Sequence, residues 1–125
     1  MDKRALVLFA HGARSASWAA PFERLRDLVQ AQRPDVDVSL AFLELMEPRL
    51  PQHVRDMVAA GITHITVVPV FLGQGGHVLR DLPVMAEALR TELPQLTLDV
   101  VGAAGEDPAV LQALAHYCSA AVPSR

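Results

Sequence analysis

The chain has 125 residues, of which 51% are hydrophobic and 20% charged, with 11 Lys and Arg against 14 Asp and Glu and a formal net charge of −3. This length favours one domain over residues 1–125, and the composition excludes a disordered chain. The net negative charge gives no overall electrostatic attraction to nucleic acid or to an anionic membrane surface. The single cysteine, Cys118, excludes an internal disulfide and a zinc site made of cysteines alone, and no apolar run approaches the roughly 20 residues of a membrane span.

The first half of the chain predicts two strands and two helices. Continuous apolar runs are typical of strands buried on both faces, whereas apolar residues at helical spacing predict helices. The first apolar run is too short for a signal peptide, so we expect a cytoplasmic location. The expected elements are a strand over 5–10 that ends at His11, a helix over about 17–32 that Pro34 ends, a strand over 36–43, and a helix from Pro48 to Ala60 that Gly61 caps.

The second half repeats this alternation. Pro69 cannot donate a hydrogen bond to a neighbouring strand, so we expect it near a strand end or on a bulge. The expected elements are a strand within 62–72, a loop over 73–77, a helix from about Asp81 to Glu92, a strand over 96–101, and a helix from Asp107 to about Ala121. Four strands alternating with four helices predict the α/β class, with an open four-stranded parallel sheet flanked by helices on both faces.

Candidate functional residues follow the predicted strands. Open α/β sheets bind ligands beyond the carboxyl ends of their strands, where His11, Glu44 and His77 are expected. Glycine flanks both histidines and lets a ligand approach the backbone closely. Any one of these residues alone would more often be an ordinary loop residue. Together, two imidazoles and a carboxylate at one edge indicate a site for a divalent metal.

Three arginines, Arg14, Arg49 and Arg80, are expected in loops at the same edge. A single arginine is commonly just solvated, but three together in an acidic chain favour an anionic ligand, because guanidinium binds carboxylate or phosphate through two hydrogen bonds. The other histidines, His53, His64 and His116, are expected to lie at the surface or to serve packing. The methionines Met46, Met57 and Met85 are expected to fill the core, and Cys118 is expected to be a small buried residue rather than a nucleophile.

Nucleotide and hydrolase motifs do not fit this chain. The glycines of 73–76 lack the pattern of a dinucleotide site, and the single lysine, Lys3, is not in a phosphate-binding loop. No Gly-x-Ser-x-Gly turn occurs, which argues against an α/β-hydrolase. A histidine phosphatase would use His11 as its nucleophile. The motif of such enzymes is similar to Arg-His-Gly at this point, whereas this chain has Ala10 before His11.

Several segments, in this order and spacing, resemble one family. They are Leu8–Arg14, Ala41–Glu44, Val67–Leu72, Gly75–Val78 and Asp81–Pro83. Together they are similar to the small-form class II chelatases of cobalamin and sirohaem biosynthesis, the sirohydrochlorin cobaltochelatases, over about residues 4–115. One departure is Ala13, where many relatives have serine.

The resemblance implies a fold, an activity and an assembly. It implies a flavodoxin-like half of the two-lobed architecture of longer chelatases, paired as a homodimer with the site in the cleft between subunits. It implies insertion of Co²⁺, or alternatively Fe²⁺ or Ni²⁺, into sirohydrochlorin without ATP. His11 and His77 would then bind the metal with Glu44 beside them, and the arginines would bind carboxylates of the tetrapyrrole.

The chemistry of imidazole agrees with this expectation. A tetrapyrrole loses two pyrrole protons as a divalent ion enters, and neutral imidazoles can hold the ion and accept those protons. Glu44 would neutralise the ion or relay a proton. Protonated imidazole cannot bind metal, so we expect chelation to fall as pH drops through the histidine range. Two rival hypotheses stay open: a non-catalytic metal-binding or delivery protein, and a small phosphohydrolase that uses His11.

Overall fold

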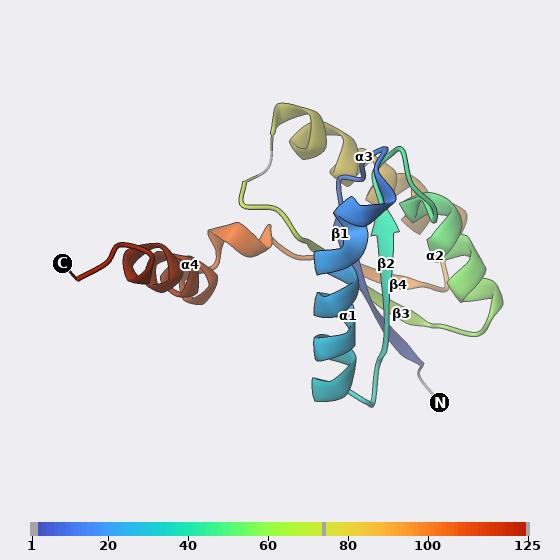
Figure 1. Ribbon diagram of the computed structural model, residues 1–125. Coiled ribbons are helices and arrows are strands. Elements are labelled where there is room, and N and C mark those ends of the chain that lie inside the picture. Colours follow the sequence, from blue (N-terminus) through green and yellow to red (C-terminus); the bar gives the residue numbers. More distant parts are fainter. Residues whose placement is uncertain (1–2, 74, 125) are drawn as a thin grey trace.

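The computed structural model describes residues 3–73 and 75–124, apart from the side chains of His77 and Leu79. Strands and helices alternate along the chain, and two short 3₁₀ turns precede α1 and α4 (Figure 1). The strands are β1 (Arg4–Ala10), β2 (Asp37–Phe42), β3 (His64–Pro69) and β4 (Thr97–Val100). The helices are α1 (Ala20–Gln32), α2 (Leu50–Ala59), α3 (Gly76–Glu92) and α4 (Pro108–Ala120).

The four strands form one parallel sheet in the order β2-β1-β3-β4. β1 is central, and its Phe9 pairs with Ala41 of β2 and with Pro69 of β3. The predicted open parallel sheet is therefore confirmed. All four strands run in the same direction, so the loops that follow β1, β2 and β3 gather at one end, at the tip of the β2 arrow in Figure 1.

The sheet separates two apolar clusters. Val7 and Phe9 of β1 face the layer of α2 and α3, where Val54 and Leu89 are also buried. Leu8 of β1 faces the other way, into the cluster that α1 covers. Side chains alternate along a strand, so the continuous apolar run of β1 supplies both clusters. Burying each large apolar side chain contributes about 1.5–3 kcal/mol to the stability of the folded state. The sheet is therefore a stable support for the loops at its carboxyl end.

The third strand agrees with the prediction, whereas the third helix differs from it. β3 ends at Pro69, so the proline lies at the strand end as expected, and the next amide, of Val70, still donates to the Phe9 carbonyl at 2.8 Å. α3 begins at Gly76 rather than near Asp81, and Pro83 lies inside it. The reason is packing. Buried side chains recur at a spacing of three or four residues and begin two residues after the helix start: Val78, Leu82, Ala86 and Leu89.

The last helix also departs from expectation. α4 has no buried residue, and it projects from the rest of the molecule instead of covering the sheet (Figure 1). Cys118, expected to be a small buried residue, is exposed there because nothing packs on this helix. Met57 is buried in the core, whereas His116 is exposed. No helix among the described residues is long and apolar enough to cross a membrane.

Candidate functional site

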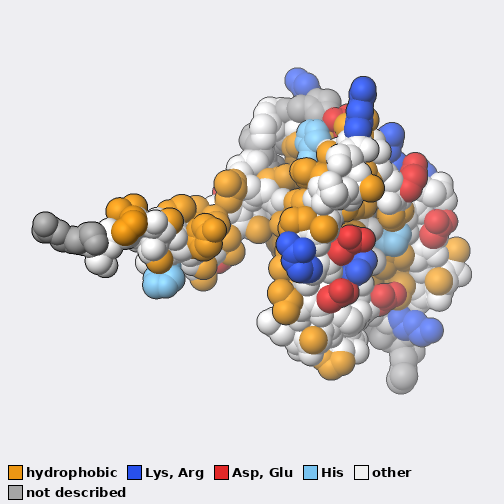
Figure 2. Space-filling model, in the orientation of Figure 1, with side chains coloured by type: hydrophobic (Ala, Val, Ile, Leu, Met, Phe, Trp, Pro, Cys, Tyr) orange, Lys and Arg blue, Asp and Glu red, His pale blue; other side chains and the backbone are white. Residues whose placement is uncertain are grey.

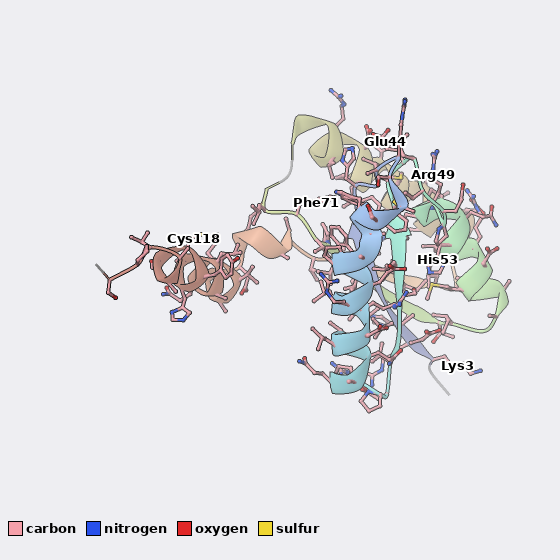
Figure 3. All side chains as sticks on the ribbon, viewed as in Figure 1. Lys3, Glu44, Arg49, His53, Phe71 and Cys118 are labelled. Carbon is pink, nitrogen blue, oxygen red and sulfur yellow. The ribbon has the colours of Figure 1, made fainter. Side chains whose placement is uncertain are left out.

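His11 and Glu44 form a side-chain pair just beyond the ends of β1 and β2 (Figure 3 labels Glu44). The Nε2 atom of His11 lies 3.0 Å from Oε1 of Glu44, and the two side chains are 45% and 43% exposed. The amide of Glu44 also donates to the carbonyl of His11 at 3.1 Å, which continues the β1–β2 pairing past the strands. The sheet thus fixes both backbones while the side chains stay open to an incoming ligand.

The backbone around this pair is in unusual conformations. Gly12 has φ +97° and lies so close to the Glu44 carbonyl that a Cβ at this position would overlap it. Leu45 has φ +68°, a left-handed conformation that a non-glycine residue rarely adopts. Glycine adopts a positive φ freely, whereas at Leu45 this conformation costs about 1–3 kcal/mol, and such strain concentrates at functional sites. The two loops are therefore held against each other at a cost in local stability, and this brings His11 and Glu44 into contact.

His77, the third expected member of the site, lies in the first turn of α3. The expectation that it directly follows a strand in a glycine-rich loop is wrong, because β3 ends at Pro69 and α3 begins at Gly76. Its side chain lies outside the described residues. Among the side chains that are described, no three His, Cys, Asp or Glu gather closely enough to hold a metal ion.

The three arginines have different positions. Arg14 is exposed in the loop after β1, and Arg49 is the exposed residue before α2 (Figure 3). Arg80 is not in a loop, since α3 begins earlier than expected, and its exposed side chain lies 3.9 Å from the carboxylate of Asp81. The three side chains start from different elements and do not by themselves outline a binding position for an anion, so their binding of tetrapyrrole carboxylates stays a prediction.

Sequence reasoning missed two exposed leucines at this edge. Leu45 follows Glu44 and is 49% exposed, and Leu72 follows β3 and is 70% exposed. Between β3 and Leu72, the Phe71 ring packs edge-on against Phe9, with ring centroids 6.0 Å apart. Apolar residues directly after strand ends were the available signal. Exposed apolar side chains next to a polar pair provide contact area for a large, flat, partly apolar ligand.

A hollow of the described surface lies at the opposite, amino-terminal end of the sheet. It has a volume of about 750 Å³ and is bordered by Arg4, Asp35 and His53. Two of its polar side chains have partners: Arg4 binds Asp35 at 2.9 Å, and Nε2 of His53 lies 2.8 Å from the hydroxyl of Ser39. Burial lowers the pKa of His53, against a smaller opposing effect of nearby carboxylates. These contacts stabilise the fold and leave His11 and Glu44 as the better candidates for chemistry.

The chain matches known proteins over nearly its whole length. The family model described as CbiX matches residues 5–121. A sirohydrochlorin cobaltochelatase of Methanopyrus kandleri is 36% identical over 81 residues, which is 65% of this chain and 57% of that protein. The match thus spans little more than half of that curated relative.

Solved structures agree with this result. A protein of Marinobacter aquaeolei VT8 described as a cobalamin (vitamin B12) biosynthesis CbiX protein superposes with a TM-score of 0.82 at 30% identity, covering 94% of this chain and 96% of that one. The sirohydrochlorin chelatase SirB of Bacillus subtilis subspecies spizizenii, in complex with cobalt, gives a TM-score of 0.79 at 25% identity, covering 94% of this chain and 50% of that one. Sequence motifs, sheet topology and family match together show that this chain belongs to the CbiX family.

Proposed function

We propose that this protein inserts a divalent metal, with Co²⁺ as the preferred substrate ion, into sirohydrochlorin. The observation that supports this most directly is the solvent-open contact between His11 and Glu44 at the carboxyl edge of a CbiX-family sheet. The cobalt complex of SirB, a structural neighbour named as a sirohydrochlorin chelatase, supports the choice of metal and tetrapyrrole. Fe²⁺ and Ni²⁺ remain alternative substrate ions.

The spacing of the pair suits a metal ion in transit. Ligand atoms about 2.1 Å from a metal and at right angles to each other lie about 3.0 Å apart. Nε2 of His11 and Oε1 of Glu44 are 3.0 Å apart. A divalent ion can therefore replace the proton between them with little movement of either side chain. In this proposal His77 supplies a further imidazole from the start of α3.

The same groups can remove protons from the tetrapyrrole. Each pyrrole N–H that gives way to the metal releases one proton, and two are released for each divalent ion. Once the ion moves from the protein to the pyrrole nitrogens, His11 and Glu44 regain free lone pairs that can accept these protons. General base catalysis of this kind typically contributes about 10²–10⁴-fold in rate. No ATP is required in this scheme.

A homodimer and a cytoplasmic location complete the proposal. The chain covers 50% of the SirB structure that it matches. A second copy facing the His11–Glu44 edge would therefore provide an architecture of the same size. Exposed Leu45 and Leu72 would then contact the macrocycle, and Arg14, Arg49 and Arg80 its carboxylates.

The direct test is an absorbance assay of the purified protein with sirohydrochlorin and Co²⁺, Fe²⁺ or Ni²⁺ in parallel. We expect the spectrum of the metallated product to appear faster than without protein, and fastest with Co²⁺. The variants His77→Ala and Glu44→Gln should slow insertion by at least about 100-fold and about 10-fold, respectively. His116→Ala, on the exposed α4 helix, is the matched control and should keep the wild-type rate.

The outcomes separate the rival functions. A protein that binds Co²⁺ tightly but leaves the insertion rate at its uncatalysed value would be a metal carrier, and the chelatase proposal would be wrong. Hydrolysis of a phosphate ester without metal, abolished by His11→Ala, would instead indicate a phosphohydrolase. Equal rates for wild type and His77→Ala would remove His77 from the mechanism.

A further inference from the structure

Gly105 lies against residues 70–72, the segment that follows β3, although the two are far apart in the sequence. It is a buried residue of η2 (Ala104–Glu106), the 3₁₀ turn that precedes α4. A Cβ at Gly105 would overlap the Cα and the carbonyl of Leu72. Gly105 does not have a positive φ, so its backbone conformation alone does not require glycine. The close approach to Leu72 is therefore what excludes a side chain here.

Two hydrogen bonds and one ring contact hold this segment on both sides. The amide of Gly105 donates to the Phe71 carbonyl at 2.7 Å. On the β1 side, the amide of Val70 donates to the Phe9 carbonyl at 2.8 Å, and the Phe71 ring packs edge-on against the Phe9 ring. Phe9 is fully buried, and His11 follows it two residues later. The segment is therefore fixed relative to the start of the His11 loop.

Leu72 ends this fixed segment with a side chain that is 70% exposed. A single exposed leucine is common on protein surfaces. A leucine on a mobile loop, however, loses conformational freedom when a ligand binds, whereas one on a backbone that is already held loses less. Figure 2 shows hydrophobic side chains at the surface of this part of the molecule, around the loops beyond the sheet. Leu72 is thus a preorganised apolar contact for a ligand.

The order of the strands brings Leu72 next to the His11–Glu44 pair. β1 lies between β2 and β3, and neighbouring strands are about 4.8 Å apart. Glu44, His11 and Leu72 therefore follow three consecutive strands across one edge of the sheet, with His11 in the middle. A tetrapyrrole is wider than one strand spacing, so a ring whose nitrogen atoms lie over His11 also reaches the segment that carries Leu72.

We propose that Gly105 is a positioning residue for substrate binding, because its close approach holds Leu72 where the leucine side chain contacts the face of the tetrapyrrole. This inference rests on the proposed function and gives a part in it to η2, a turn that follows β4, at the edge of the sheet opposite β2. The contact exists before the metal enters and persists during insertion. It therefore strengthens the binding of substrate and transition state alike, and its loss changes KM rather than kcat.

Binding of metal-free sirohydrochlorin, followed by quenching of the single tryptophan, Trp18, tests the contact without any insertion. Leu72→Ala should raise the dissociation constant about tenfold, because it removes apolar contact area. In the insertion assay it should raise KM for sirohydrochlorin by a similar factor and keep kcat within about twofold. Leu28→Ala is the matched control, since Leu28 is a leucine of α1 that is 62% exposed, and both constants should stay unchanged.

Gly105→Ala tests the positioning, with Gly102→Ala as its matched control. Gly102 lies in the same connection between β4 and α4, but a Cβ there would meet nothing within 4 Å. Gly105→Ala should raise the dissociation constant about tenfold, whereas Gly102→Ala should leave it unchanged. The double variant Gly105→Ala/Leu72→Ala should bind no more weakly than Leu72→Ala alone, because both changes act through one contact. A purely structural role of Gly105 would instead give losses that add.

Circular dichroism checks that every variant is folded. If Gly105→Ala does not fold, Phe71→Leu loosens the same segment from the β1 side. It should raise the dissociation constant about threefold, again without adding to the effect of Leu72→Ala.

The outcomes separate this inference from the function on which it rests. A wild type that neither binds nor metallates sirohydrochlorin would overturn the proposed function and this inference with it. Equal binding by wild type and Leu72→Ala would overturn the leucine contact and leave the proposed function standing. Losses that add in the double variant, or an equal loss in Gly102→Ala, would overturn the positioning role of Gly105.

Discussion

Two histidine–carboxylate pairs lie at opposite ends of the sheet with the same separation. His11 and Glu44 are 3.0 Å apart at the carboxyl end, and His64 and Asp99 are 3.0 Å apart toward the amino end. Both pairs are substantially exposed. Distance and exposure therefore do not distinguish them, and the difference lies in the backbone that holds each one.

His64 and Asp99 belong to adjacent strands with regular backbone, and an exposed cross-strand pair of this kind contributes only about 0–1 kcal/mol. His11 and Glu44 instead stand on loops in which Gly12 and Leu45 have positive φ. An ordinary surface pair needs no strained backbone. This difference in backbone is why we propose His11 and Glu44, and not His64 and Asp99, as the pair that meets a ligand.

The largest expected effect is on catalysis. His11→Ala should reduce the initial rate of cobalt insertion into sirohydrochlorin by at least about 100-fold, because it removes a metal ligand and a proton acceptor. His64→Ala removes an equally spaced pair at the other end and should stay within about twofold of wild type. Parallel absorbance assays, with circular dichroism as the fold control, test this. Equal losses in both variants would break the distinction between the pairs.

The next effect is on stability and compares two glycines. Gly12 and Gly61 have φ +97° and +103°, but only at Gly12 would a Cβ overlap backbone, whereas at Gly61 the nearest atom is 3.8 Å away. Gly61→Ala should lower the free energy of unfolding by about 1–2 kcal/mol, because alanine disfavours a positive φ. Gly12→Ala should lower it by about 3 kcal/mol or more, because the new Cβ also overlaps the Glu44 carbonyl. Urea unfolding of both variants measures the difference. Equal costs would show that the two loops are not held against each other.

A smaller effect depends on pH at the amino end. Burial lowers the pKa of His53, so the folded state binds fewer protons than the unfolded state below the ordinary value of about 6.5. The folded state therefore has its full stability above about pH 6.5 and loses part of it as the pH falls from 6.5 toward the lowered pKa of His53. His53→Gln, which can still bond Ser39, should flatten the dependence. Melting temperatures between pH 5 and 8 check it, and identical profiles would contradict it.

The smallest effect concerns Asp35. Hydrogen bonds from Arg33 lower the pKa of this carboxyl to about 2, so its charge is kept above that pH and lost below it. Arg33→Gln should return the pKa toward the ordinary value of about 3.9, with the insertion rate unchanged. An NMR titration of the carboxyl carbon measures the shift. A slower insertion rate in this variant would mean that the amino end takes part in the chemistry after all.

The sequence by itself determined the α/β alternation, the parallel sheet, and the placement of His11 and Glu44 after two strands. These features follow from local rules: continuous apolar runs mark buried strands, and parallel strands bring their carboxyl ends together. Because β1 and β2 are neighbours in register, two residues directly after them meet without any further information.

Only the tertiary structure decided the rest. Packing of Val78 and Leu82 against the core moved the start of α3 to Gly76, so that His77 and Arg80 lie on a helix rather than in a loop. Pro83 suggested a later helix start, but burial of side chains over about three turns, from Val78 to Leu89, outweighs one missing hydrogen bond. Likewise, Cys118 was expected to be buried on the last helix, yet whether a helix packs on its own sheet depends on the path of the preceding connection, and with Gly105 held against Leu72 the helix has no buried residue.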